Sequence, residues 1–147
     1  MYSYCNKNNY SMSNGRFAIS VHILTLLAKF PEEWLSSEFL SGSININPVL
    51  VRKELSNLRE KGFVLSKEGK AGGSRLALNA TAIRMADVYA SVRQTDLLGK
   101  AVNQPNPDCP VGRQINQHLN ALYESAEKAL TESLAQMTLA EFSEKFN

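Results

Sequence analysis

The part of this sequence that most restricts the fold is the segment at residues 47–78, where several local signals follow one another. Asn47 can cap a helix, and Pro48 suits the first helical position because no N–H group is needed there. Gly62 is typical of the residue that ends such a helix. Two short apolar runs then flank a loop that contains Gly69, Gly72 and Gly73, which predicts a β-hairpin.

The segments before this one predict two further helices. Residues 16–30 are densely apolar, as in a core helix that is buried on most sides, and Pro31 ends it. Residues 36–40 begin with a capping hydroxyl group and an early acidic residue, so we expect a short helix that Gly42 ends. A short helix, a turn, a capped helix and a hairpin in this order indicate a winged helix-turn-helix.

The segments after the hairpin are also predicted to be helical, with a proline-rich linker before the longest helix. Helices are expected at residues 81–93, 111–136 and 139–146. The predicted fold is mainly α with a small β-hairpin, in the α+β class. We expect a flexible tail at residues 1–13, a winged helix-turn-helix domain at residues 14–98, and a linker with a long dimerisation helix at residues 99–147.

Composition argues against several classes of protein. The chain has 147 residues and contains no run of about 18 apolar residues, so no membrane span is predicted. Its first residues lack the apolar stretch of a secretory signal, and a cytoplasmic location is therefore expected. Two cysteines are too few for a disulfide framework or a self-contained metal site. Since no phosphate-binding loop is present either, we expect no enzyme, no metal and no cofactor.

Charge is unevenly distributed along the chain. Residues 47–78 hold seven basic and three acidic side chains, a net charge of +4. Residues 101–147 hold three basic and six acidic side chains, a net charge of −3. A basic middle segment beside an acidic remainder favours a protein that presents one face to a polyanion such as double-stranded DNA.

The helix that starts after Asn47 has two different faces. Val51, Leu55 and Leu58 form an apolar stripe, and the opposite half carries the polar and charged positions. Residues near the start of a recognition helix enter the major groove, so we expect four base-reading positions. These are Asn47, Val49, Arg52 and Lys53. Ser56 and Arg59 are expected to contact phosphate, and Asn57 to add a further exposed donor.

The hairpin resembles a wing that approaches the DNA backbone. Glycines at its tip would let backbone N–H groups come close to phosphate, and an arginine could enter a narrow minor groove. An amphipathic helix alone is more often a solvated surface helix, and a glycine loop more often an ordinary turn. Together they favour DNA binding. The predicted DNA-binding residues are Ser37, Asn47, Pro48, Val49, Arg52, Lys53, Ser56, Arg59, Lys70, Gly72, Gly73, Ser74 and Arg75.

The long C-terminal helix carries an apolar stripe with alternating spacings of four and three residues. Its members are Ile115, Leu119, Leu122, Ala126 and Ala129. The stripe could pack on its own domain or on a second copy of the chain. The helix is longer than a small winged-helix domain needs, so we predict a homodimer in which two half-sites are read together.

Cys109 precedes this helix and has two interpretations. It is either a small linker residue or a redox-sensitive thiol near the start of the long helix, where the helix dipole favours thiolate. Two other functions stay open besides DNA binding. Winged helices also bind proteins, and a thiol enzyme could use Cys109.

Several segments together resemble one family of bacterial regulators. They are the short helix at residues 36–40, the helix start at 47–53, residues 58–64, the Gly72-Gly73 wing and residues 108–112. The chain is similar to the Rrf2 family of winged-helix transcription regulators over about residues 14–137. That family includes the iron–sulfur cluster regulator, the nitric-oxide-sensing repressor and the cysteine-metabolism repressor.

The resemblance implies a homodimeric repressor with a long crossing helix, recognition positions within residues 47–59 and a wing at residues 70–75. Cluster-binding members carry three cysteines in the linker, whereas this chain has only Cys109 there. One thiolate cannot hold a [2Fe–2S] cluster, which needs about four protein ligands. The resemblance therefore implies a member without the cluster. Its signal would be a redox agent acting through one thiol, a small molecule or a protein partner.

Overall fold

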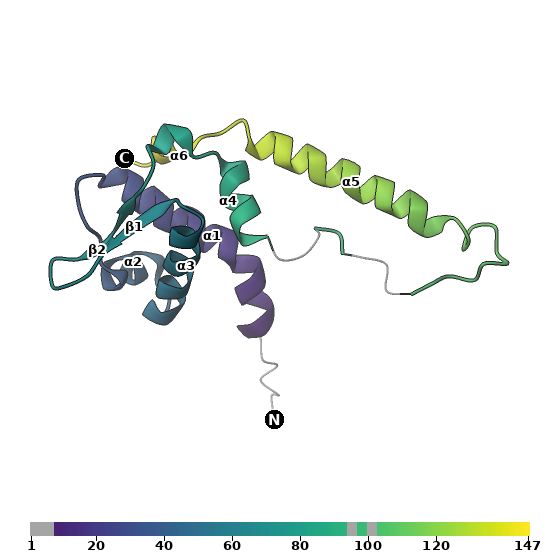
Figure 1. Cartoon of the computed structure of the whole chain (residues 1–147), viewed down its shortest axis with the longest axis horizontal. Coiled ribbons are helices and arrows are strands. Elements are labelled where there is room, and N and C mark those ends of the chain that lie inside the picture. The colour runs from purple at the N-terminus through teal and green to yellow at the C-terminus, as the bar shows by residue number, and fades with distance from the viewer. Residues whose placement is uncertain (1–7, 94–96, 100–102) are drawn as a thin grey trace, which may run out of the picture.

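The computed structural model describes residues 8–93, 97–99 and 103–147, without the side chains of residues 8–14. Its elements, shown in Figure 1, are α1 (Asn8–Lys29), α2 (Ser37–Ile44), α3 (Pro48–Glu60), β1 (Val64–Lys67), β2 (Gly73–Leu76), the 3-10 helix η1 (Ala80–Ala82), α4 (Met85–Val92), α5 (Ile115–Leu134) and α6 (Leu139–Ser143). The prediction of a mainly helical fold with one small β-hairpin is confirmed. α1 begins at Asn8, earlier than predicted, while residues 1–7 of the expected tail lie outside the described residues.

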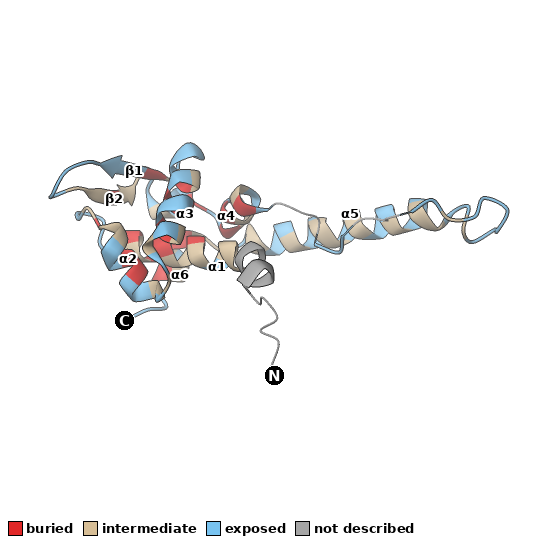
Figure 2. Cartoon of the chain, turned by 90° about the horizontal axis from the view of Figure 1, so that it is seen from below, coloured by how far each residue is buried: buried red, intermediate tan, exposed pale blue. Residues whose placement is uncertain are grey.

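The core lies where α1 crosses the short helices. Ile23, Leu24 and Leu27 of α1 are fully buried, as are Val51 and Leu58 of α3. Each such aliphatic side chain contributes about 1.5–3 kcal/mol when it leaves water. The apolar stripe predicted for the helix after Asn47 therefore faces the core, and the opposite side of α3 faces solvent (Figure 2).

Helix α2 starts as predicted but ends later. The side chain of Ser36 accepts a hydrogen bond from the N–H of Phe39 at 3.1 Å, which caps the first turn. Gly42 does not end the helix, because α2 continues to Ile44. Asn45 ends it instead, with a left-handed φ of 60° and its N–H directed to the carbonyl of Ser41. Asparagine tolerates this conformation better than most residues.

Helix α3 begins and ends where the sequence indicates. The Oδ1 atom of Asn47 accepts a hydrogen bond from the N–H of Val49 at 2.8 Å, and Pro48 occupies the first helical position. Gly62 follows the last turn with a φ of 86°, a conformation that glycine adopts without strain. Local signals thus define both ends of the predicted recognition helix.

The hairpin is paired closer to its turn than the two apolar runs indicated, because β1 continues to Lys67 and β2 begins at Gly73. β1 and β2 are antiparallel, with Val64 opposite Leu76 and Lys67 opposite Gly73. A short segment between α1 and α2 joins the same sheet. The N–H of Leu35 donates to the carbonyl of Ser74 at 2.9 Å, and the N–H of Ser74 donates to the carbonyl of Leu35 at 2.8 Å. A Cβ atom on Gly73 would lie 2.4 Å from the carbonyl oxygen of Leu35, so this approach requires glycine.

The segment after the hairpin forms two elements instead of the single predicted helix. η1 and α4 are separated by Ile83 and Arg84, of which Ile83 is fully buried. The carbonyl of Ile83 accepts a hydrogen bond from the N–H of Leu139 at 2.7 Å, and Leu139 at the start of α6 is also fully buried. The last helix therefore packs on the winged domain, although we expected it within the C-terminal unit.

Helix α5 projects from the winged domain (Figures 1 and 2). It is anchored to α4 through Glu127, whose carboxylate accepts a hydrogen bond from the Tyr89 hydroxyl at 3.3 Å and lies 3.5 Å from the Arg93 guanidinium. None of the residues of α5 is buried. Across the described part of the chain, no helix combines the length and apolar character that crossing a membrane requires.

Candidate nucleic-acid interface

The solvent side of α3 carries the polar side chains that the sequence placed there. Arg52, Lys53 and Ser56 are exposed, and Val49 near the helix start is 59% exposed. Because Val51, Leu55 and Leu58 are buried, the helix can rotate little about its own axis without exposing the core. These four exposed residues therefore form a face of fixed orientation.

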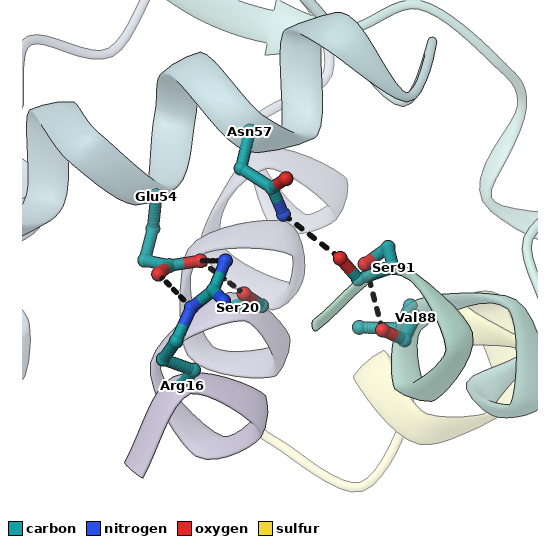
Figure 3. A network of polar contacts seen from close by, with 6 residues as sticks. All are labelled: Arg16, Ser20, Glu54, Asn57, Val88 and Ser91. Carbon is teal, nitrogen blue, oxygen red and sulfur yellow. Dashed lines mark hydrogen bonds and ion pairs between the residues drawn. The ribbon is translucent and has the colours of Figure 1, made fainter. Parts of the chain in front are cut away.

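A buried ion pair sets the position of α3 against α1. Glu54 is only 4% exposed, and its carboxylate lies 2.5 Å from the Nε atom of Arg16 (Figure 3). The Oγ atom of Ser20, also on α1, donates to the same carboxylate at 3.3 Å. In Figure 3 both partners reach up from α1 toward one turn of α3. Such charged hydrogen bonds have narrow geometric requirements, so they fix the separation and register of the two helices.

The contact of Glu54 with α1 was not predicted from the sequence. The sequence did offer a signal for its burial, because Glu54 lies between Val51 and Leu55 on the buried side of the helix.

The structure corrects the prediction for Asn57. We predicted an exposed donor, but its amide donates to the carbonyl of Ser91 at 3.1 Å and links α3 to α4 (Figure 3).

Two arginines of α3 make contacts at the edges of the exposed face. The Arg52 guanidinium lies 3.9 Å from the Glu38 carboxylate on α2, and both side chains are more than half exposed. An ion pair this exposed is weak, and a phosphate or base could replace it. Arg59 donates to the Oγ atom of Ser66 at 3.1 Å, which connects the end of α3 with β1.

The remaining predicted residues near α3 lie around its start. Asn47 is exposed and uses its Oδ1 atom for the helix cap, so its amide NH₂ group still faces outward. Pro48 is half-buried beside it. Ser37 at the start of α2 is also half-buried, and its hydroxyl donates to Glu38 at 3.3 Å.

The wing divides into an exposed tip and a supported base. Lys70 is exposed at the tip, and Gly72 follows in a tight turn where a Cβ atom would lie 2.0 Å from the carbonyl oxygen of Lys67. Lys67 itself lies over the ring of Trp34 at 5.8 Å. Only glycine fits at position 72, and the tip can therefore bring backbone and Lys70 close to another molecule.

Ser74 and Arg75, at the base of the wing, have partners within the chain. Ser74 is 5% exposed, and both its backbone groups pair with Leu35. The Arg75 guanidinium lies 4.9 Å from the centre of the Trp34 ring and donates to the carbonyl of Pro31 at 3.0 Å. These residues hold the wing against the segment between α1 and α2. Their partners are distant in sequence, so local pattern gave no sign of this role.

Comparison with known proteins identifies the family. The model of the Rrf2 family, described as an iron-dependent transcriptional regulator, matches residues 13–145. The chain belongs to the Rrf2 family. It is 36% identical over 128 residues to YwnA of Bacillus subtilis (strain 168), which is named as an HTH-type transcriptional regulator; the match covers 87% of this chain and 94% of YwnA.

Solved structures agree with this assignment. A crystal structure of a protein described as DNA-binding is 31% identical, has a TM-score of 0.70, and is matched over 86% of this chain and 97% of that one. CymR, the global cysteine regulator of B. subtilis, has the same fold, with 21% identity and a TM-score of 0.67 over 90% of this chain and 95% of that one. The resemblance drawn from sequence motifs is confirmed. As an Rrf2 protein the chain is a winged-helix transcriptional regulator, not an enzyme.

The Rrf2 family model is named as iron-dependent, but the described residues of this chain do not form an iron site. Cys109 is an exposed free thiol whose Sγ atom accepts a hydrogen bond from the N–H of Gly112 at 3.4 Å. Among residues 8–93, 97–99 and 103–147 no three His, Cys, Asp or Glu side chains are grouped to hold a metal ion. A [2Fe–2S] cluster needs about four ligands, so these residues do not fit it.

The structure also changes the argument for Cys109 as a sensor. We predicted a helix starting near residue 111, whereas α5 begins at Ile115. Cys109 therefore lies in a turn before the helix and not in its first turn, where the helix dipole acts. Its exposure leaves the thiol accessible, and the redox role stays a prediction.

Proposed function

We propose that this Rrf2 protein binds specific DNA sequences as a homodimer and represses transcription. The observation that carries the proposal is the outward face of α3, which is polar, exposed and held in one orientation by the core and by Glu54. A helix of this kind fits the major groove of duplex DNA, where side chains near its start reach base edges.

Each exposed residue would have a distinct role. Arg52 and Lys53 would donate to base acceptors, and Val49 would contact a thymine methyl group. The outward amide of Asn47 is a further base donor, at the helix start that Pro48 helps to build. Ser37, Ser56 and Arg59 would contact phosphate, as would Lys70 and the backbone near Gly72 and Gly73. Ser74 and Arg75 would instead keep the wing in place.

The homodimer would form through the apolar face of α5. Ile115, Leu119 and Ala126 of this face are half-buried, while Leu122 is 60% exposed and Ala129 is exposed. A helix that projects from its domain with such a face can bury it against the same face of a second copy. A two-fold axis through α5 would present two copies of α3 to half-sites about one helical turn apart.

Selection of bound sequences from a random duplex pool tests the proposal. We expect enrichment of an inverted repeat, and binding of the selected duplex should fall steeply with salt because phosphate contacts release counterions. A winged helix that recognises only a protein would show no shift with any duplex at low salt. That result would overturn the proposal in favour of the protein-interaction alternative.

A further inference from the structure

A groove lies on the side of α1 that faces α6 and the last turn of α5. Its volume is about 780 Å³, within the range of about 300–1,000 Å³ that is usual for small-molecule sites. It is open to solvent on one side, so a ligand could enter without unfolding the domain. Its walls are largely apolar and include Phe17, Val21, Leu26, Leu134, Met137 and Phe142.

The charge on the described lining of this groove is positive. Among the described residues that line it, Lys29 is the only Lys or Arg, and none is acidic. The Lys29 ammonium donates to the carbonyl of Phe146, which places it where the C-terminal segment meets α1. An ammonium has three N–H donors, so a ligand can share it with that carbonyl. His22 and Ser43, joined by a contact of 3.0 Å, add further hydrogen-bonding groups.

An apolar wall with one cation selects a ligand of matching chemistry. The body of the ligand would be aliphatic or aromatic, and its head would be a single carboxylate, sulfonate or phosphate. Methionine at 85 and 137 can adjust its side chain to different apolar shapes. We propose that this groove binds a small amphipathic anion, and that its occupancy changes the affinity for DNA.

The second half of this proposal rests on the proposed DNA-binding function, and helix α1 supplies the connection. Phe17 and Val21 of α1 line the groove, while Arg16 and Ser20 of the same turns hold Glu54 of α3. A ligand that displaces α1 must therefore strain the buried ion pair or move α3 with it. A shift in the orientation of α3 changes the fit of two linked recognition helices to DNA.

Binding of decanoate to the full chain tests the site, with decan-1-ol as the uncharged comparison. Isothermal titration calorimetry, at concentrations below micelle formation, gives the two dissociation constants. Lys29→Gln removes the cation and should weaken decanoate binding by about fivefold to tenfold without changing that of decan-1-ol. Ala18→Trp places a large side chain in the groove from an exposed lining position and should abolish binding of both. Lys128→Gln, at an exposed lysine of α5, is the matched control.

Unfolding midpoints of the variants without ligand confirm that each chain is folded. Equal decanoate binding by all variants would overturn the site, because it would show non-specific adsorption. Dissociation of a dimer by Ala18→Trp, without decanoate binding to the unchanged chain, would show that a second copy occupies the groove, and would also overturn it.

A further titration with the selected duplex separates ligand binding in the groove from its proposed effect on DNA affinity. Decanoate should change the DNA affinity of the unchanged chain severalfold and leave that of Ala18→Trp unaltered. Decanoate binding with unaltered DNA affinity would reject only the proposal that the bound anion changes DNA affinity. Failure to bind any duplex would reject the proposed function, while the calorimetric result for the groove would stand.

Discussion

Two arginines near the proposed DNA surface, Arg52 and Arg75, have the same chemistry but different surroundings. Arg75 stacks on Trp34 and donates to a backbone carbonyl, and its side chain is 29% exposed. The Arg52 side chain is 55% exposed, and its guanidinium lies 3.9 Å from the exposed Glu38 carboxylate. Local partners therefore leave Arg52 more accessible to a DNA molecule than Arg75, which supports the wing.

Replacing Arg52 by alanine should reduce specific binding by about 1–3 kcal/mol, the usual value of a bidentate contact to a base pair. The loss of affinity should be larger for the selected duplex than for random DNA of equal length. Fluorescence anisotropy at fixed salt measures both affinities. Arg113→Ala, at an exposed arginine before α5, is the control and should leave both unchanged. Equal losses on the two duplexes would remove Arg52 from the base-reading set.

Replacing Glu54 by alanine should lower the free energy of unfolding by about 3–5 kcal/mol, because the Arg16 guanidinium would lose its buried partner. Urea denaturation followed by circular dichroism measures the change. Glu60→Ala is a matched control on the same helix, since Glu60 is exposed, and should shift stability by about 0.5 kcal/mol or less. A similar small change in the two variants would mean that the buried ion pair of Glu54 adds little to stability.

These residues also show what sequence could and could not predict. The burial of Val51, Leu55 and Leu58 followed from helical spacing, which is local information. Glu54 lies on the same side of the helix, but its partner is 38 positions away, and residue type alone suggested a solvated charge. Contacts with distant segments likewise define Ser74 and Arg75. The positions of site residues were therefore predictable where periodicity sets them, and not where tertiary contacts do.

At the scale of elements, glycine has opposite effects in the wing and in α2. A Cβ atom on Gly73 would lie 2.4 Å from the Leu35 carbonyl oxygen, whereas a Cβ atom on Gly42 meets nothing within 4 Å. Gly42 was predicted to end α2, but it lies inside the helix. Its exposed position and the left-handed Asn45 explain the difference, because a helix can pass through glycine when another residue supplies the end.

This contrast gives a paired prediction for stability. Gly73→Ala should destabilise the protein by about 1–3 kcal/mol through overpacking, and should weaken binding to all DNA sequences because the wing moves. Gly42→Ala should instead stabilise it by about 0.5–1 kcal/mol, the helix-propensity difference between the two residues. Thermal unfolding of the two variants measures both changes. A stable Gly73→Ala chain with normal DNA affinity would contradict the requirement for glycine in the wing.

At the scale of the whole molecule, α5 is the element whose partly exposed apolar stripe is not accounted for by packing within one chain. The winged domain has its own core, to which α6 contributes Leu139, whereas α5 has no fully buried residue and packs against that core at its last residue, Leu134. Sequence periodicity predicted the helix and its apolar stripe, but not how far it would project. Whether a stripe packs on its own domain or on a second copy depends on tertiary geometry, which periodicity does not contain.

Leu122 lies near the middle of the stripe and is 60% exposed, so an acidic substitution there should not disturb the winged domain. We expect Leu122→Glu to be a folded monomer, because two carboxylates would meet in the apolar seam of the proposed dimer. Sedimentation velocity measures the change in mass, and thermal unfolding checks the fold. Gln117→Glu is the matched control, since Gln117 is exposed on the opposite side of the helix and should stay dimeric.

The same monomer should bind the selected inverted repeat about 100-fold more weakly or worse, because linked half-sites no longer reinforce each other. Its affinity for a duplex with one half-site should match that of the unchanged chain, since α3 and the wing are intact. Anisotropy titrations with the two duplexes separate these effects. If Leu122→Glu stays dimeric, or if it becomes monomeric and still binds the full repeat at normal affinity, then α5 does not form the interface through which this protein reads DNA.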